Sequence, residues 1–146
     1  MLVIDQATVT AIFAHARRDH PDEACGIVAG PAGSERPERF IPMANAAKSP
    51  RILYEVNSQD LLRLYRELDK RDEVPVVVYH SHTADEAYPS PTDIALAGEP
   101  DAHYVLVSTR EPDRDELRSF RIVAGVVTEE EVQVVAALPP VRSVSC

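Results

Sequence analysis

The chain has 146 residues, the size of one compact domain. Its 15 Lys and Arg residues against 24 Asp and Glu residues give a formal net charge of −9, which argues against a nucleic-acid binder and against a protein held on an anionic membrane, because both rely on a basic surface. Hydrophobic residues make up 45% of the sequence, enough for a packed core, and neither an apolar stretch of about 20 residues nor a signal-peptide pattern is visible, so we expect a cytoplasmic protein.

Two helices are predicted in the first half of the chain. The first covers residues 5–20, where apolar side chains recur at the i, i+3, i+4, i+7 spacing of one buried stripe. Pro21 disfavours a helical conformation at the residue before it and so helps to end this helix. The second helix covers residues 58–71, with Asn57 or Ser58 as its N-cap.

Seven further segments are predicted strands. They are Ala24–Ala29, Arg39–Met43, Ile52–Val56, Val74–Tyr79, His103–Ser108, Leu117–Val123 and Val126–Val135. The segment Val74–Tyr79 is continuously apolar, as expected of a strand buried on both faces, and Gly125 predicts a hairpin between the last two strands. Because helices and strands mix without strict alternation, the predicted fold class is α/β, with a mixed curved β-sheet flanked by helices. We assign residues 1–137 to a single domain and 138–146 to a flexible C-terminal tail.

The pattern that carries chemistry directly follows the apolar strand. His80 and His82 are two residues apart, so on a strand their side chains point to the same face and can converge on one metal ion. Ser90 is a good N-cap and Pro91 suits the first helical position, which predicts a helix whose first turn contains Asp93. Two histidines and one carboxylate leave a fourth tetrahedral position for water, which is typical of a catalytic zinc site.

Hydrolysis also requires a base, although zinc lowers the pKa of a coordinated water to about 7. Glu23, where the first helix gives way to a strand, is the candidate, but spacing alone does not select it among the acidic residues. A zinc deaminase would need His-x-Glu and Pro-Cys-x-x-Cys, and the sequence has neither. The two cysteines are too few for a disulfide framework or a Cys-rich zinc module.

Together these residues resemble the JAMM (MPN+) family of zinc metalloproteases. The family pattern of an upstream Glu, His-x-His and Ser-x-x-Asp is matched by Glu23, by His80 and His82, and by Ser90 and Asp93 at the family's spacing. The resemblance implies that His80, His82 and Asp93 bind Zn²⁺. It also implies that a water on the zinc is the nucleophile, that Glu23 is the general base and acid, and that Ser90 helps to hold the oxyanion. The implied fold is the JAMM/MPN sandwich, which is similar to that of cytidine deaminases.

The substrate is also implied by the resemblance. The chain lacks the insertions that read ubiquitin chains, and it is similar to small bacterial members that act on ubiquitin-like sulfur carriers. We therefore expect hydrolysis of the amide bond after the C-terminal Gly of a carrier that ends in Gly-Gly, with release of cysteine. Two alternatives are an isopeptidase that removes ubiquitin-like modifiers and a non-catalytic MPN assembly module, which the intact ligand set disfavours.

Some features stay open or have structural interpretations. Thr83 stands where the family usually has Pro, which removes no ligand. Ser90 could be catalytic or only a helix cap, and a homodimer is possible. Cys25 is predicted to be a small buried core residue. His103 is expected to pack or to lie on the surface rather than bind metal, and Glu129–Glu131 is expected to be a solvated turn or strand entry.

Overall fold

The computed structural model describes residues 1–141, so the last five residues of the predicted tail lie outside the described part. Its elements are β1 (Leu2–Asp5), α1 (Gln6–Asp19), β2 (Cys25–Pro31), β3 (Arg39–Met43), α2 (Ser58–Lys70), β4 (Glu73–His82), α3 (Pro91–Leu96), β5 (His103–Ser108), β6 (Glu116–Val123), β7 (Val126–Glu130) and β8 (Val132–Val135). None of the helices among these residues is long and apolar enough to cross a membrane.

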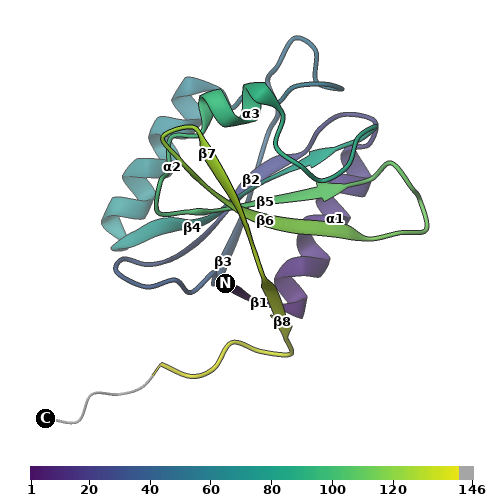
Figure 1. The fold of residues 1–146 in the computed structure, drawn as a ribbon. Coiled ribbons are helices and arrows are strands. Elements are labelled where there is room, and N and C mark those ends of the chain that lie inside the picture. Colours follow the sequence, from purple (N-terminus) through teal and green to yellow (C-terminus); the bar gives the residue numbers. More distant parts are fainter. Residues whose placement is uncertain (142–146) are drawn as a thin grey trace, which may run out of the picture.

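A mixed six-stranded sheet in the order β3-β2-β4-β5-β6-β7 forms the centre of the fold. The central pair β4–β5 is parallel, and the other neighbouring pairs are antiparallel. A separate two-stranded sheet joins β1 to β8 in parallel. The predicted α/β class with a mixed sheet flanked by helices is confirmed (Figure 1).

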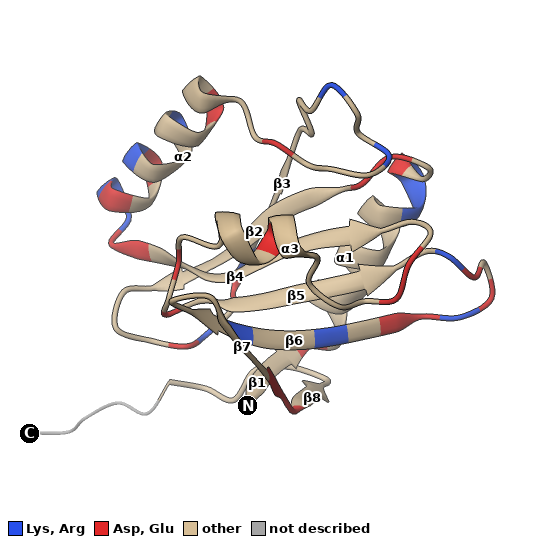
Figure 2. Cartoon of the chain, turned by 45° about the horizontal axis from the view of Figure 1, so that its top comes forward, with Lys and Arg blue, Asp and Glu red and all other residues tan. Residues whose placement is uncertain are grey.

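The helices cover both faces of the six-stranded sheet. On one face, Ile12 and Ala16 of α1 share a buried cluster with Val28 and Val77. Because successive strand residues point to opposite faces, Ile27 points the other way, where α2 packs. The helix α3 lies on this second side too, over the cluster that contains Tyr104 and Leu106 of β5. Both acidic and basic residues occur along α2 and along β6 (Figure 2).

The first helix is fixed at its start by a side chain. Asp5 is its N-cap and accepts a hydrogen bond from the backbone N of Thr8 at 2.9 Å. The helix spans Gln6–Asp19, one residue shorter at each end than predicted. The preceding residues Leu2–Asp5 form β1, a strand that the sequence analysis did not predict.

One strand prediction is wrong and another is wrong in part. The segment Ile52–Val56 has no strand, because the carbonyl of Leu53 and the backbone N of Glu55 bond to the side chain of Asn45. The predicted strand Val126–Val135 is divided at Glu131, since β7 continues the hairpin with β6 while β8 leaves the sheet to pair with β1. The apolar strand in turn extends past Tyr79 to His82, which keeps both histidines of the motif within regular structure.

Candidate metal centre

The two histidines of the motif lie at the C-terminal end of β4. This strand is paired with β2 on one side and with β5 on the other, and its pairing with β5 continues as far as His82 opposite Ser108. His80 and His82 are both buried, with 1% and 7% of their surface exposed. Their Nε2 atoms are 3.3 Å apart, so the strand brings the two imidazoles to one point.

Asp93 completes this cluster from the first turn of α3. Ser90 is the N-cap, as predicted, and its hydroxyl oxygen accepts a hydrogen bond from the backbone N of Asp93 at 3.1 Å. In return, Oδ2 of Asp93 accepts from the backbone N of Ser90 at 2.8 Å. The same Oδ2 atom lies 3.0 Å from Nε2 of His80 and 3.1 Å from Nε2 of His82.

These three atoms fit a tetrahedral zinc ion. Ligands about 2.0–2.1 Å from zinc in tetrahedral geometry lie about 3.3–3.4 Å from one another, close to the distances found between His80, His82 and Asp93. Nδ1 of His82 donates a hydrogen bond to the carbonyl of Glu86 at 2.9 Å, which leaves the Nε2 lone pair free for a metal. His80 is oriented differently, by stacking on the ring of Tyr54 at a centroid distance of 4.5 Å.

The pKa shifts of His80 and Asp93 suit metal binding, which requires neutral imidazole and ionised carboxylate, whereas the shift of His82 favours its protonated form. Burial lowers the pKa of His80 and so favours its neutral form. Burial also acts to lower the pKa of His82, but hydrogen bonds to Asp93 and to the Glu86 carbonyl raise it overall. Although burial opposes ionisation of Asp93, its close contacts with both histidines and with the backbone N of Ser90 hold the pKa of its carboxyl well below the usual range.

Glu23 lies beside this cluster. Without the resemblance it would be expected to be a solvated charge, but only 6% of its surface is exposed. A carboxylate oxygen of Glu23 and the ligand nitrogens of His80 and His82 all lie within 4.8 Å of one another. Burial raises the pKa of Glu23 to about 7, with Asp93 adding to the increase and His82 opposing it. A carboxyl group with this pKa can both take up and release a proton near neutral pH.

The backbone of Glu23 is held by the loop that follows β3. The side-chain amide of Asn45 donates to the carbonyl of Glu23 at 2.9 Å, and the backbone N of Glu23 donates to the carbonyl of Pro50 at 2.7 Å. The motif did not identify positioning roles for Asn45, Tyr54 or Glu86. Turn geometry and ring stacking determine these roles, and neither leaves a periodic signal in the sequence.

Two hollows lie near the cluster, one lined by Tyr54 and the other by His82. A groove of about 410 Å³ runs beside Tyr54 between β2, α2 and α3, and its lining includes the apolar residues Ile27, Met43, Val78, Leu61 and Leu96. A second hollow, of about 420 Å³, is lined by His82, Ser90, Tyr88, Asp85, Glu86 and Arg110. The polar hollow thus contains His82 itself and an arginine, whereas the apolar groove is connected to the cluster through Tyr54, which stacks on His80.

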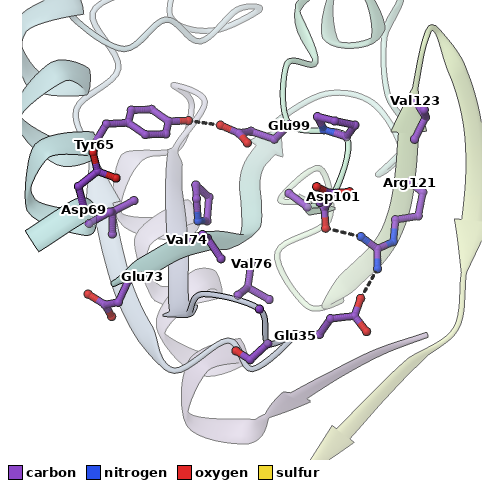
Figure 3. Close-up of a pocket in the computed structure, with 16 residues that line it drawn as sticks. Glu35, Tyr65, Asp69, Glu73, Val74, Val76, Glu99, Asp101, Arg121 and Val123 are labelled. Carbon is purple, nitrogen blue, oxygen red and sulfur yellow. Dashed lines mark hydrogen bonds and ion pairs between the residues drawn. The ribbon is translucent and has the colours of Figure 1, made fainter. Parts of the chain in front are cut away.

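A cavity of about 770 Å³ at the opposite end of β4 contains none of the cluster residues. It is lined by the start of β4, the end of α2 and the segment 99–102, and many of its side chains are acidic (Figure 3). Tyr65 donates a hydrogen bond to Glu99 there, while Arg121 binds the Asp101 carbonyl and Glu35. This cavity lacks the histidines and the carboxylate of the metal centre.

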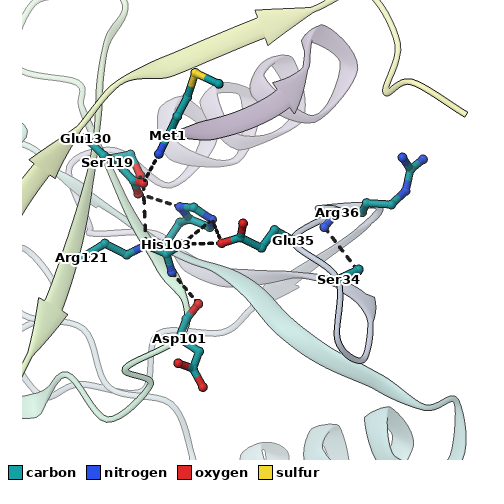
Figure 4. A network of polar contacts seen from close by, with 9 residues as sticks. All are labelled: Met1, Ser34, Glu35, Arg36, Asp101, His103, Ser119, Arg121 and Glu130. Carbon is teal, nitrogen blue, oxygen red and sulfur yellow. Dashed lines mark hydrogen bonds and ion pairs between the residues drawn. The ribbon is translucent and has the colours of Figure 1, made fainter. Parts of the chain in front are cut away.

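Another buried histidine cluster surrounds His103 and, like the large cavity, lies outside the metal centre. Nδ1 of His103 donates to Glu130 at 2.6 Å, and Arg121 donates to its Nε2 at 3.2 Å (Figure 4). His103 packs in the interior and lies outside the metal cluster, as expected. The expectation that the run Glu129–Glu131 is solvated is wrong for Glu130, whose side chain is 8% exposed, because its charge is paired within this cluster. Cys25 is buried, as predicted.

Known proteins are similar to this chain over most of its length. Residues 5–123 match the family of prokaryotic homologues of the JAB domain. The CysO-cysteine peptidase of Mycobacterium tuberculosis is 65% identical over 92% of this chain and 92% of its own length. A Thermus thermophilus protein named "Probable TtuB-protein conjugate cleaving protease" is 32% identical over 66% of this chain and 64% of its own.

The fold agrees with these matches. A JAB1/MPN domain protein from Archaeoglobus fulgidus superposes with a TM-score of 0.61 at 16% identity, covering 92% of this chain and 99% of that one. The resemblance to JAMM (MPN+) proteins is thus confirmed at the level of family and fold, and the relatives named as a peptidase and as a conjugate-cleaving protease support a peptidase. The chain belongs to the family of prokaryotic homologues of the JAB domain.

Proposed function

We propose that the protein is a zinc-dependent peptidase that hydrolyses the amide bond after the C-terminal Gly of a ubiquitin-like sulfur-carrier protein and releases cysteine. The observation that carries this proposal is the meeting of His80, His82 and Asp93 at one point beside the buried carboxyl of Glu23. The 65% identity to a protein named CysO-cysteine peptidase supports the choice of substrate.

Glu23 acts first as the general base and then as the general acid in this reaction. His80, His82 and Asp93 would hold the zinc ion, which when bound supplies a Lewis acid that polarises the scissile carbonyl and makes water more acidic. Glu23 takes a proton from the attacking water at its carboxylate and delivers it to the amide nitrogen as the C–N bond breaks. The carrier then ends in a carboxylate, and the amine leaves as the amino group of cysteine.

Ser90 can serve both as a helix cap and as a catalytic donor. A hydroxyl has one donor and two acceptor positions, and the cap uses an acceptor position, because the backbone N of Asp93 donates to the Ser90 oxygen. The Ser90 proton therefore stays available for a hydrogen bond to the oxyanion that develops at the scissile carbonyl. The two roles that the sequence left as alternatives are compatible.

The apolar groove beside Tyr54 suits the extended tail of the carrier. Main-chain hydrogen bonds to a sheet tolerate Gly, and a narrow approach to the centre favours residues without side chains. Leu61 of α2 and Leu96 of α3 line the groove and are 37% and 71% exposed, so they are available for an apolar residue upstream of the Gly-Gly terminus.

The alternative function is cleavage of isopeptide bonds between a ubiquitin-like modifier and a protein lysine. The Thermus relative, whose name describes a conjugate-cleaving protease, favours keeping this candidate.

The test is to incubate the protein with Gly-Gly carriers extended by cysteine, by a longer peptide or by an isopeptide-linked lysine, and to identify the products by mass. We expect cleavage after the terminal Gly, release of cysteine and loss of activity after zinc chelation. Cleavage of the lysine conjugate without release of cysteine would favour the isopeptidase function instead. Activity unaffected by chelation in protein free of zinc by elemental analysis would refute the metal mechanism.

A further inference from the structure

We propose that Arg110 binds the α-carboxylate of the residue that is released, so that the enzyme prefers a single C-terminal amino acid as leaving group. This inference rests on the proposed function and adds a residue that determines its specificity. The starting observation is the polar hollow of about 420 Å³, which contains His82 of the metal cluster and Ser90 at the start of α3. Among the described residues that line it, Arg110 is the only Lys or Arg.

A hydrogen bond to Glu116 holds the guanidinium of Arg110 in place. Its Nη2 donates to Oε1 of Glu116 at 2.8 Å, and Oε2 of Glu116 accepts from the backbone N of Ala87 at 2.6 Å. The Glu116 side chain is 10% exposed, whereas that of Arg110 is 35% exposed and reaches the hollow. Arg110 is thereby tied to the loop whose Glu86 carbonyl orients His82.

The backbone at Arg110 is tied to the same loop. Its N donates to the hydroxyl oxygen of Ser108 at 3.3 Å, and that hydroxyl donates to the carbonyl of Asp85 at 2.6 Å. A guanidinium has five N–H donors, so the bond to Glu116 leaves others for a second carboxylate. Arginine binds carboxylates through two parallel hydrogen bonds, which adds geometric selectivity to the charge attraction.

The chemistry of the leaving group explains why a positively charged side chain is expected in this hollow. When a single amino acid is released, its α-carboxylate is attached to the carbon that bears the scissile nitrogen, so it must lie close to the reacting bond. An isopeptide-linked lysine has no carboxylate near its ε-nitrogen, and a longer peptide has an amide at that position. Asp85 and Glu86 also line the hollow, so Arg110 is the group there that can compensate an incoming negative charge.

The test compares two forms of one substrate, a Gly-Gly carrier extended either by cysteine or by cysteine amide. We expect kcat/KM of the wild-type protein to be about 10- to 100-fold higher for the acid. Arg110→Gln should lower the value for the acid by a similar factor and leave the value for the amide unchanged. Arg114→Gln is the matched control, because Arg114 lies in the same connection between β5 and β6 but is 59% exposed and does not line the hollow.

A binding measurement separates recognition from turnover. In a Glu23→Gln background, the acid form should bind more tightly than the amide form by calorimetry, and Arg110→Gln should remove this difference. Equal use of acid and amide by the wild type, or an equal loss on both substrates in Arg110→Gln, would overturn the role of Arg110 while the proposed function stands. Failure of the wild type to cleave either form would overturn the proposed function together with this inference.

Discussion

Two buried histidine clusters of the protein, one at the metal centre and one around His103, differ in how their charges are balanced. At the end of β4, the nitrogens of His80 and His82 converge on the carboxylate of Asp93, and no Lys or Arg among the described residues pairs with that carboxylate. At the start of β5, Glu130 accepts from His103 and from Ser119 at 2.8 Å, and it also pairs with the N-terminal amine at 3.2 Å (Figure 4).

The two clusters also use their ring nitrogens differently. Both nitrogens of His103 have protein partners, a carboxylate on one side and Arg121 on the other. Both Nε2 atoms of the β4 pair instead point at one shared carboxylate oxygen, an arrangement that a cation completes. A histidine whose ring nitrogens both have protein partners is structural. Two histidines that converge on one carboxylate, with no Lys or Arg paired to it among the described residues, mark a site for a bound cation.

Removing a metal ligand should give the largest effect. We expect His82→Ala to weaken zinc binding by at least about 100-fold and to abolish peptidase activity, because the cluster loses one of its three donors. Zinc content per chain after gel filtration measures this. His103→Gln is the control from the other cluster and should keep its zinc; loss of zinc from both variants would contradict the distinction between the clusters.

The next largest effect is expected from Glu23→Gln. The amide cannot take up the proton of water, so kcat should fall by about 10²- to 10⁴-fold while zinc remains bound. Single-turnover kinetics and elemental analysis on the same sample test both parts. Loss of metal together with activity would show that Glu23 is a ligand rather than the base.

A smaller loss is expected from Ser90→Ala. Removing an oxyanion donor should lower kcat by about 10²-fold, and losing the N-cap should lower the free energy of unfolding by about 1 kcal/mol. Ser90→Thr retains both a cap and a hydroxyl and should recover most of the activity. If Ser90→Ala is destabilised but retains kcat, Ser90 is a helix cap alone.

The smallest effect on catalysis is expected in the second cluster, where Glu130→Gln should leave kcat unchanged and lower the free energy of unfolding by about 1–3 kcal/mol at neutral pH. Burial acts to raise the pKa of Glu130, but hydrogen bonds from His103 and Ser119 hold it below its usual 4.5. The stabilisation from the ionised form is therefore complete above pH 4.5 and is lost as the pH falls through the lowered pKa.

Urea unfolding of wild type and Glu130→Gln at neutral and at acidic pH measures this contribution. The difference between the two proteins should shrink on acidification. A difference that is constant with pH would mean that the carboxylate of Glu130 contributes no ionic stabilisation.

The sequence predicts the cluster better than its surroundings. The position of Asp93 follows from a local rule, because Ser90 and Pro91 specify the start of a helix and with it the place of the third residue. The burial of Glu23 does not follow from any local pattern, since it depends on loop residues that are distant in sequence. The strand predicted at Ile52–Val56 failed for the same reason, because a side chain satisfies backbone groups that would otherwise pair in a sheet.

The parallel pair β1–β8 was also beyond local prediction. Leu2–Asp5 is too short to give a clear periodic signal, and its partner Val132–Val135 is at the other end of the described chain. Long-range pairing of this kind depends on the completed core, in which Leu2 and Ile4 are fully buried.

The amide of Asn45 has a consequence for how the protein tolerates change in sequence length. This side chain forms hydrogen bonds to the backbone of Glu23, Leu53 and Glu55. It therefore links the proposed general base to the loop that contains Tyr54, whose ring stacks on His80. An insertion between Asn45 and Tyr54 would disturb the base and a ligand together. Additional segments that recognise a substrate should therefore be tolerated outside this loop, for example in the exposed turn that contains Gly33.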